Sequence, residues 1–193
     1  VALEPGPRCD LGAQQRSNVI GLREDRGALR GSDIPAALAA RVQLFARWIS
    51  FDKTWLSNQE IVDFRNLAKT ITAVAGWTSG QQNLTGDGEP IRIGVGFVTA
   101  NTFDVLGTKP LFGRAISEAE DAPNGPQVAV LGYPLWQARY GGDPSVVGKT
   151  LMINDLPVEV IGVMPEGFRL PTDFTEEAAE PTQLWGPIQW DMS

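Results

Sequence analysis

The segment from Gly142 to Thr150 is the part of this sequence that most resembles a chemical site. It contains two glycines, the second followed by Lys149 and Thr150. A phosphate-binding P-loop has a similar pattern, because its backbone N–H groups surround phosphates and its lysine reaches them. Five residues separate the glycines here, whereas a P-loop needs four and joins a buried strand to a helix. Here a helix is expected before the segment and a strand after it, so a nucleotide site is disfavoured.

Clustered carboxylates are a second candidate for chemistry. Two carboxylates facing each other in a cleft could serve a glycosidase, and two close acids could hold calcium, although the ligand spacing of an EF-hand is absent. Acids flanked by Pro and Ala are more often solvated surface, but a carboxylate-dependent hydrolase stays open as an alternative. The acids concerned are Glu118, Glu120, Asp121, Glu176, Glu177 and Glu180.

The tryptophans are a third candidate, because exposed indole rings can stack on sugars or form a partner surface. Burial is the commoner use of this side chain. A carbohydrate- or peptide-binding module therefore needs at least two rings on one open face. The six residues are Trp48, Trp55, Trp77, Trp136, Trp185 and Trp190.

The composition excludes several other classes of site. The 193-residue chain has no His, a single Cys (Cys9) and a formal net charge of −7. Ser-His-Asp and Cys-His catalysis, His-ligated metals, an internal disulfide and Cys-held clusters all need residues that are missing. A net negative chain is also a poor nucleic-acid binder. Residues 1–50 carry 7 basic and 5 acidic groups and residues 51–193 carry 9 and 18, which suggests an atypical N-terminal segment joined to an acidic domain.

The elements that must position any site are indistinct near the N-terminus. Residues 1–31 show no sustained period of apolar residues and are interpreted as an irregular or disordered arm. Residues 33–40 could start a short helix. The even positions of residues 42–49 are apolar, which favours a strand, with a helix left open.

Stronger local signals begin at Ser57-Asn58-Gln59-Glu60, a capping box that opens a helix. Strands from Trp77 to Leu84 and from Ile91 to Thr99 are expected on either side of a Gly-rich turn. Asn101 is a candidate cap for a short helix over residues 102–106 that ends at Gly107. The capped helix would place four apolar residues on one face, Ile61, Phe64, Ala68 and Ile71.

The second half of the chain reads as short, mixed elements. The pattern lacks regular strand–helix–strand alternation and favours an α+β fold. From residue 165 onward the chain is Pro- and Glu-rich and is interpreted as a tail. The expected elements are an acidic turn opened by Ser117, a buried strand over residues 127–131, a helix over residues 133–140 stopped by Gly141, a turn capped by Asp143 or Ser145 and ending at Gly148, and a hairpin of residues 150–153 and 157–164 around Asn154-Asp155.

An ordered set of short motifs runs from about Arg41 to Trp185. They include Ala100 to Gly107, Pro110 to Arg114, Val130 to Trp136, Arg139 to Lys149 and Val160 to Phe168. In this order they resemble the periplasmic core domain of MacB-type (FtsX-like) ABC transporter permeases, closest to the duplicated orphan permease branch. The resemblance gives structural, non-catalytic roles to Asn101, Phe103, Leu106, Gly107, Gly113, Arg114, Trp136, Gly141, Gly148, Gly162, Pro165 and Phe168.

The resemblance implies a two-lobed α+β domain, with a porter-like lobe and a smaller strand-rich lobe. Such a domain is inserted between the first two membrane helices on the periplasmic side of the bacterial cytoplasmic membrane. It performs no catalysis and needs no cofactor or metal. Its implied partners are the membrane part of its own permease, a cytoplasmic ATPase subunit and a periplasmic adaptor, with motion of the membrane helices transmitted to substrate or partners.

The sequence departs from the family in two places. Residues 1–31 are polar where the family has an apolar membrane helix, and the family domain continues beyond the Leu184-Trp185 motif towards the first lobe. We therefore expect a fragment in which residues 1–31 form an arm and residues 32–193 form a core domain that is incomplete at its C-terminal end.

Overall fold

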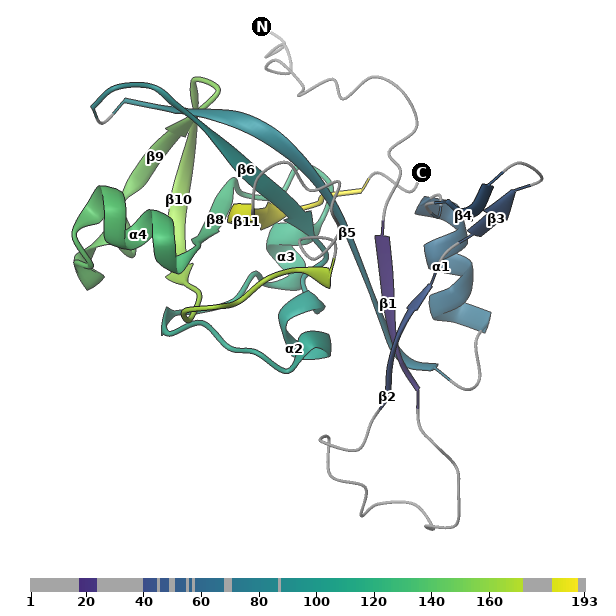
Figure 1. The fold of residues 1–193 in the computed structure, drawn as a ribbon. Coiled ribbons are helices and arrows are strands. Elements are labelled where there is room, and N and C mark those ends of the chain that lie inside the picture. The colour runs from purple at the N-terminus through teal and green to yellow at the C-terminus, as the bar shows by residue number, and fades with distance from the viewer. Residues whose placement is uncertain are drawn as a thin grey trace, which may run out of the picture.

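The structure is a computed structural model that describes residues 18–23, 40–44, 46–48, 51–54, 56, 58–67, 71–86, 88–171 and 182–190. Its strands form a nine-stranded mixed sheet and a separate two-stranded sheet. Helices accompany the sheet without regular alternation, which confirms the α+β prediction (Figure 1). The elements are β1 (Asn18–Arg23), β2 (Ala40–Leu44), β3 (Ala46–Trp48), β4 (Phe51–Thr54), α1 (Asn58–Leu67), β5 (Ile71–Thr85), β6 (Ile91–Val98), α2 (Thr102–Leu106), β7 (Phe112–Gly113), α3 (Glu118–Asp121), β8 (Val128–Leu131), α4 (Tyr133–Tyr140), the 3₁₀ turn η2 (Pro144–Val146), β9 (Thr150–Ile153), β10 (Leu156–Val163) and β11 (Thr182–Pro187).

Six of the strands close into a ring. The order is β5-β6-β11-β8-β10-β9, and β9 closes the circle because it pairs with β10 on one side and with β5 on the other. The closing pairs to β5 are Leu84 with Ile153 and Thr85 with Met152. The β6–β11 and β8–β10 pairs are parallel and the others are antiparallel. We call these six strands the ring.

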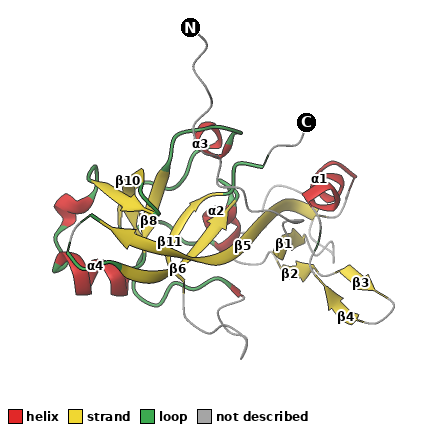
Figure 2. Ribbon diagram, turned by 90° about the horizontal axis from the view of Figure 1, so that it is seen from above, coloured by secondary structure: helices red, strands yellow, loops and turns green. Residues whose placement is uncertain are grey.

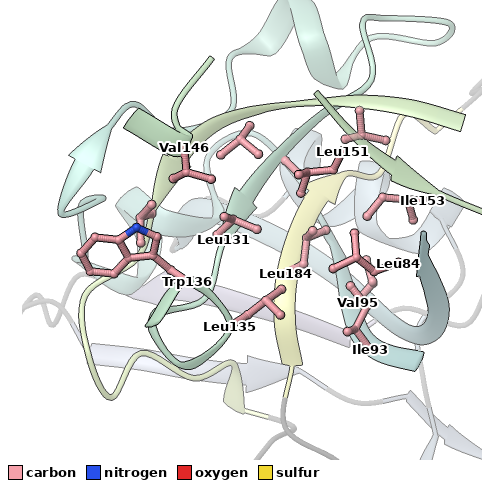
Figure 3. Packing of buried hydrophobic residues seen from close by; sticks show 14 residues of the cluster. Leu84, Ile93, Val95, Leu131, Leu135, Trp136, Val146, Leu151, Ile153 and Leu184 are labelled. Atoms are coloured by element: carbon pink, nitrogen blue, oxygen red, sulfur yellow. The ribbon is translucent and has the colours of Figure 1, made fainter. Parts of the chain in front are cut away.

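The interior of the ring is an apolar core to which every one of its strands contributes. Figure 3 shows these side chains converging from strands that are distant in sequence. Leu135 and Trp136 of α4 and Val146 of η2 join the same cluster, so the helix and turn close off the core. The strand members are Leu84, Ile93, Val95, Ala129, Leu131, Leu151, Ile153, Val158, Val160, Val163 and Leu184.

A second core lies on the outer face of the ring. Residues of β8 alternate between the two cores: Val128 and Val130 belong to the outer one, Ala129 and Leu131 to the inner one. This period of two is expected for a strand that is buried on both faces. Phe103 and Val105 of α2 cover the outer core.

β5 is much longer than its neighbours and extends out of the ring. Residues from Trp77 to Leu84 pair with β6, whereas Ile71 to Trp77 pair with β1, which in turn pairs with β2. The hairpin of β3 and β4 and the helix α1 belong to the same end of the molecule (Figure 2). We call β1–β4, α1 and residues 71–76 the N-terminal region.

Several predicted elements are confirmed because local turn residues define them. Asn154 and Asp155 both adopt positive φ, at 46° and 64°, as a two-residue hairpin turn between β9 and β10 requires. Gly107 and Gly141 adopt the left-handed conformation at the ends of α2 and α4. The strands flanking residues 85–90, the buried strand before α4 and the acidic turn of α3 also form where they are expected.

Four predictions are wrong. Residues 18–23 of the supposed arm form β1, because pairing with β2 and β5 supplies the order that the local sequence does not. The stretch over residues 42–49 is divided between β2 and β3 instead of forming one strand. The helix α1 ends at Leu67, and Ile71 begins β5. Part of the supposed tail forms β11.

Other expectations lie outside the described residues. These are residues 33–39 of the expected short helix, the capping serine Ser57, Cys9 and the acids at residues 176, 177 and 180. Ala40, the last residue of that expected helix, instead begins β2. The two-lobe division and the boundary between residues 31 and 32 stay predictions.

Candidate functional site

The most elaborate polar arrangement in the described part of the chain lies where β5 leaves the ring. Here β6 ends at Val98, and β11 ends at Pro187 directly beside it. The segments that follow β6 and β11 meet the edge of β5 that β6 no longer covers. We define the junction as Val74, Gly76, Thr99–Asn101, Asp121 and Ile188–Trp190.

β6 ends opposite Trp77, so the preceding residues of β5 have no β6 neighbour. Thr99 and Asn101 bind their backbone groups instead. The Thr99 N–H donates to the Gly76 carbonyl at 2.9 Å, and the Gly76 N–H donates to Thr99 Oγ1 at 3.1 Å. Asn101 Nδ2 donates to the Val74 carbonyl at 3.0 Å, while its Oδ1 accepts from Thr99 Oγ1 at 2.8 Å. Buried backbone groups of a strand must find partners, and these side chains supply them where β6 turns away.

The structure places Asn101 at the start of α2, as predicted, but not in the predicted role. Its side chain makes no hydrogen bond that caps the helix. The Asn101 amide binds the Val74 carbonyl and the Thr99 hydroxyl instead of the first N–H groups of α2.

Asp121, the last residue of α3, binds both chains that leave the ring. Its Oδ2 accepts from the Ala100 N–H at 2.9 Å. Its Oδ1 accepts from the Ile188 and Gln189 N–H groups at 3.1 and 3.0 Å. Hydrogen bonds from backbone N–H groups to a carboxylate are charge-assisted and stronger than neutral ones, so one side chain fixes the ends of β6 and β11 together.

Gln189 makes the second half of this arrangement. Its Nε2 lies 2.8 Å from the Glu120 carbonyl, 3.0 Å from that of Gly125 and 3.2 Å from that of Pro126. Its Oε1 accepts from Gln127 Nε2 at 3.0 Å. The backbone of Gln189 has φ of 50°, a left-handed conformation that non-glycine residues rarely adopt and that its surroundings must stabilise.

The residues on either side of Gln189 point towards the N-terminal region. Ile188 and Trp190 form an apolar cluster with Leu56, Ile61 of α1 and Val74 of β5. A Cβ added to Gly76 would lie 2.6 Å from Cη2 of Trp190. The indole therefore packs directly on the backbone of β5, a contact that only glycine permits.

An ion pair holds α3 in place. Arg114 binds Glu120 through two parallel bonds, Nη1 to Oε2 at 2.8 Å and Nη2 to Oε1 at 2.6 Å. The Ser117 N–H and hydroxyl both donate to Glu120 Oε2 at 2.8 Å. The bonds from Arg114 lower the pKa of the buried Glu120 carboxyl to about 2, against the opposing effect of burial, and the Ser117 bonds add to the lowering. The bond to Glu120 also raises the pKa of Arg114.

The other residues singled out from the sequence do not converge on one cleft. Phe103 and Phe168 pack with Trp185 in the outer core, with ring centroids 5.6 Å apart for the two phenylalanines and 5.0 Å for Phe168 and Trp185. Leu106 packs against the same core. Pro165 begins the segment that carries Phe168, and its carbonyl accepts from the Phe168 N–H at 3.3 Å.

Two of the selected glycines allow β7 and β10 to approach closely. Gly113 and Gly162 are paired across these strands. A Cβ on Gly113 would lie 2.2 Å from the Ile161 carbonyl oxygen, and one on Gly162 would lie 2.6 Å from that of Arg114. Arg114 directly follows β7 and binds Glu120.

The remaining selected residues lie around α4. Trp136 is buried, and its Nε1 donates to the Asp143 carbonyl at 2.9 Å. Gly141 ends the helix, and Gly148 donates its N–H to the Val160 carbonyl at 2.7 Å. The segment that resembled a P-loop is thus the turn η2 between α4 and β9, with Asp143 as the cap that accepts from the Ser145 N–H.

The two alternative sites are not favoured by this geometry. Trp77, Trp136, Trp185 and Trp190 are all buried, so among the tryptophans whose side chains are described none presents an open ring face. An acid-dependent hydrolase needs a raised carboxyl pKa, whereas that of Glu120 is lowered. Across the described residues, no group of three or more Cys, Asp or Glu is placed to hold a metal ion.

Sequence reasoning missed most of the junction. Asp121 was quoted only as a clustered acid, and Gln189 fell in the supposed tail. Their bonds join residues 21 to 69 positions apart, and no local pattern signals such pairs.

The family model of the MacB-like periplasmic core domain matches residues 15–190. The chain belongs to this family. The resemblance inferred from the ordered motifs is therefore confirmed. The match also begins before β1, in accord with that strand being part of the fold.

Two solved structures are similar to this fold. The extracellular domain of the noncanonic ABC-type transporter YknZ from Gram-positive bacteria matches with a TM-score of 0.54 at 17% identity, over 69% of this chain and 63% of that one. The periplasmic region of MacB from Actinobacillus actinomycetemcomitans matches with a TM-score of 0.53 at 22% identity, over 94% of this chain and 69% of that one. The chain thus spans somewhat less than two thirds of the YknZ domain. A search of curated proteins found no significant match.

Among the helices in the described part of the chain, none has the length and apolar character to cross a bilayer.

Proposed function

We propose that this MacB-like domain is the non-catalytic extracytoplasmic part of an ABC transporter permease. It stands on the outer side of the bacterial cytoplasmic membrane, tethered by membrane helices of its parent protein. Its role is to couple the motion of those helices to substrate export or to partner proteins. The family match over residues 15–190 carries this proposal.

The junction supports a mechanical role. Force applied to the N-terminal region reaches the ring along the continuous backbone of β5 and through the packing of Trp190 on Gly76. The first route is a strand, and the second is a buried packing contact of Trp190. Packed elements transmit displacement because protein interiors have low compressibility.

The proposed partners are the membrane part of the same permease, a cytoplasmic ATPase subunit and a periplasmic adaptor. ATP hydrolysis would occur in the ATPase and not in this domain. The domain itself needs no cofactor in this role, and its acidic charge argues against nucleic acid as a partner.

The parent reading frame gives the first test. We expect membrane helices on both sides of this domain and an ATPase encoded in the same protein or nearby. A parent without flanking membrane helices contradicts the proposal.

Cysteine labelling in cells tests the location. In the full-length parent with its native cysteines replaced, Cys9→Ser included, a Glu118→Cys substitution puts the only thiol at an exposed position of α3. A membrane-impermeant maleimide should label it in intact spheroplasts. Labelling only after lysis places the domain in the cytoplasm and refutes the assignment.

A matched pair of glycine substitutions tests coupling. Gly76→Ala inserts a methyl group between β5 and Trp190, whereas a Cβ at Gly80 in the same strand meets no atom within 4 Å. In membranes containing the full-length parent and its ATPase, Gly76→Ala should lower transport per ATP hydrolysed while Gly80→Ala does not. Equal behaviour of the two variants at equal expression contradicts the mechanical role.

A further inference from the structure

We propose that Asp121 and Gln189 form a latch that holds residues 188–190 against the ring, and that opening this latch releases the N-terminal region while the ring stays folded. The latch concerns which part of the folded domain opens first, and it is therefore separate from the proposed transport role.

The geometry of residues 188–190 suggests the latch. The side chains of Ile188 and Trp190 lie in the apolar cluster of the N-terminal region, and the Gln189 side chain between them points to the opposite side. The three residues thus bind two bodies at once. Ile188 and Trp190 contact α1 and β5, whereas Gln189 binds the carbonyl groups around the end of α3.

The latch is held by a small set of polar bonds. Asp121 accepts both backbone N–H groups of Ile188 and Gln189 and also that of Ala100. The Gln189 side chain binds three carbonyl groups and the Gln127 amide. The Ile188 N–H also lies 3.0 Å from the Val98 carbonyl. The ring, by contrast, is closed by backbone pairing on all sides and has an apolar core inside it. Local opening starts where buried apolar contacts are few, so residues 188–190 should separate from α3 before the ring opens.

The conformation of Gln189 favours release once its bonds are lost. A left-handed φ of 50° is unfavourable for a residue with a Cβ. The bonds to Asp121 and to the carbonyl groups of residues 120, 125 and 126 stabilise it. Without them the chain can return to an extended conformation, which moves Trp190 away from Gly76.

Asp121→Asn tests the latch with minimal change in shape. Both carboxylate oxygens of Asp121 face N–H donors, so the amide NH₂ of Asn must face a donor on one side. Asp143→Asn is the matched control. The exposed Asp143 carboxylate binds Ser145 and forms a long ion pair of 4.0 Å with Lys149, and the Ser145 hydroxyl can rotate to accept from an amide.

The measurement is amide hydrogen exchange of the 193-residue chain, followed by mass spectrometry. In Asp121→Asn, exchange in α1 and in residues 71–75 should rise about 10-fold or more, while β8 and β10 remain protected as in the wild type. Asp143→Asn should leave α1 unchanged. An equal rise in all segments, or no rise in α1, overturns the latch.

Gln189→Ala keeps the test decisive if Asp121→Asn does not fold. Alanine at φ of 50° is as strained as glutamine, so the substitution removes only the side-chain bonds. It should raise exchange in α1 several-fold, with Gln137→Ala on the exposed face of α4 as its control. Unchanged exchange in α1 again refutes the latch. Neither outcome bears on the transport role, because the experiment involves no transport.

Discussion

The ring and the junction lie next to each other, yet different forces stabilise them. The ring encloses an apolar core to which all six strands contribute. The junction depends on side chains that bind backbone groups, namely Thr99, Asn101, Asp121 and Gln189. Apolar burial is non-directional, whereas hydrogen bonds need defined geometry. The ring is therefore suited to keep its shape, and the junction is suited to fix the orientation of the N-terminal region relative to the ring.

Four substitutions test this difference, and the largest effect is expected in the core beside the ring. Trp185 is 1% exposed and packs edge-on against Phe103 and Phe168. Trp185→Ala should lower the free energy of unfolding by about 4 kcal/mol and should destabilise all segments together, as urea denaturation followed by circular dichroism will measure. Trp185→Phe should cost clearly less. A loss below about 1 kcal/mol for the alanine variant would show that this core does not control the fold.

The junction should respond more locally. Gly76→Ala drives a methyl group against the Trp190 ring and should cost about 1–3 kcal/mol. Gly80→Ala, in the same strand with open space around it, should be neutral or stabilising by up to about 1 kcal/mol because alanine restricts the unfolded chain. Both values come from urea denaturation. If the two variants have the same free energy of unfolding, the close packing of Trp190 on β5 is contradicted.

The stabilisation that the Arg114–Glu120 ion pair gives to α3 should depend on pH. The pKa of Glu120 is lowered to about 2 from an ordinary value of 4.5. Its charged form therefore stabilises the fold above pH 4.5, and this contribution is lost as the pH falls from 4.5 towards 2. Glu120→Gln should cost about 1–2 kcal/mol at pH 7 and should flatten the fall in stability between pH 4.5 and pH 2.

Stability of this variant is measured by urea denaturation at a series of pH values. Glu118→Gln, an exposed change in the same helix, is the control and should follow the wild type. A Glu120→Gln variant that loses stability with acid as steeply as the wild type contradicts the ion pair.

The smallest effect is expected at the end of the ring that α4 covers. Gly141 has φ of 61° and a Cβ there would meet no atom within 4 Å, so only the backbone conformation opposes a side chain. Gly141→Ala should cost about 1 kcal/mol, and Gly141→Asn should cost less because asparagine tolerates this conformation. Thermal denaturation can resolve the difference. Equal losses for the two variants would point to a contact that the structure does not contain.

The sequence predicted the elements whose limits are set by nearby residues. The hairpin at Asn154-Asp155 and the helix ends at Gly107 and Gly141 are examples, because a positive φ at one position determines the turn. β1 and β11 were missed for the opposite reason. Both are short, and both owe their order to pairing with strands that are distant along the chain.

The candidate site was predicted less well than the fold. Asn101 was identified through its position before α2, but its amide binds β5 instead of capping the helix. Gln189 could not be identified at all, since its partners are the carbonyl groups of residues 120, 125 and 126. A backbone carbonyl leaves no trace in the residue type, so such a site becomes visible only when the chain is folded.

The position of β11 has a consequence for the order in which the domain is made. Of the strands in the ring, β11 is the last to be synthesised, yet it lies between β6 and β8. Until residues 182–187 are available, two strands made much earlier must leave a gap between them with unpaired edges. Contacts of such long sequence separation form slowly. The ring therefore cannot be completed strand by strand as the chain emerges, and it closes only after residues 182–187 have been made.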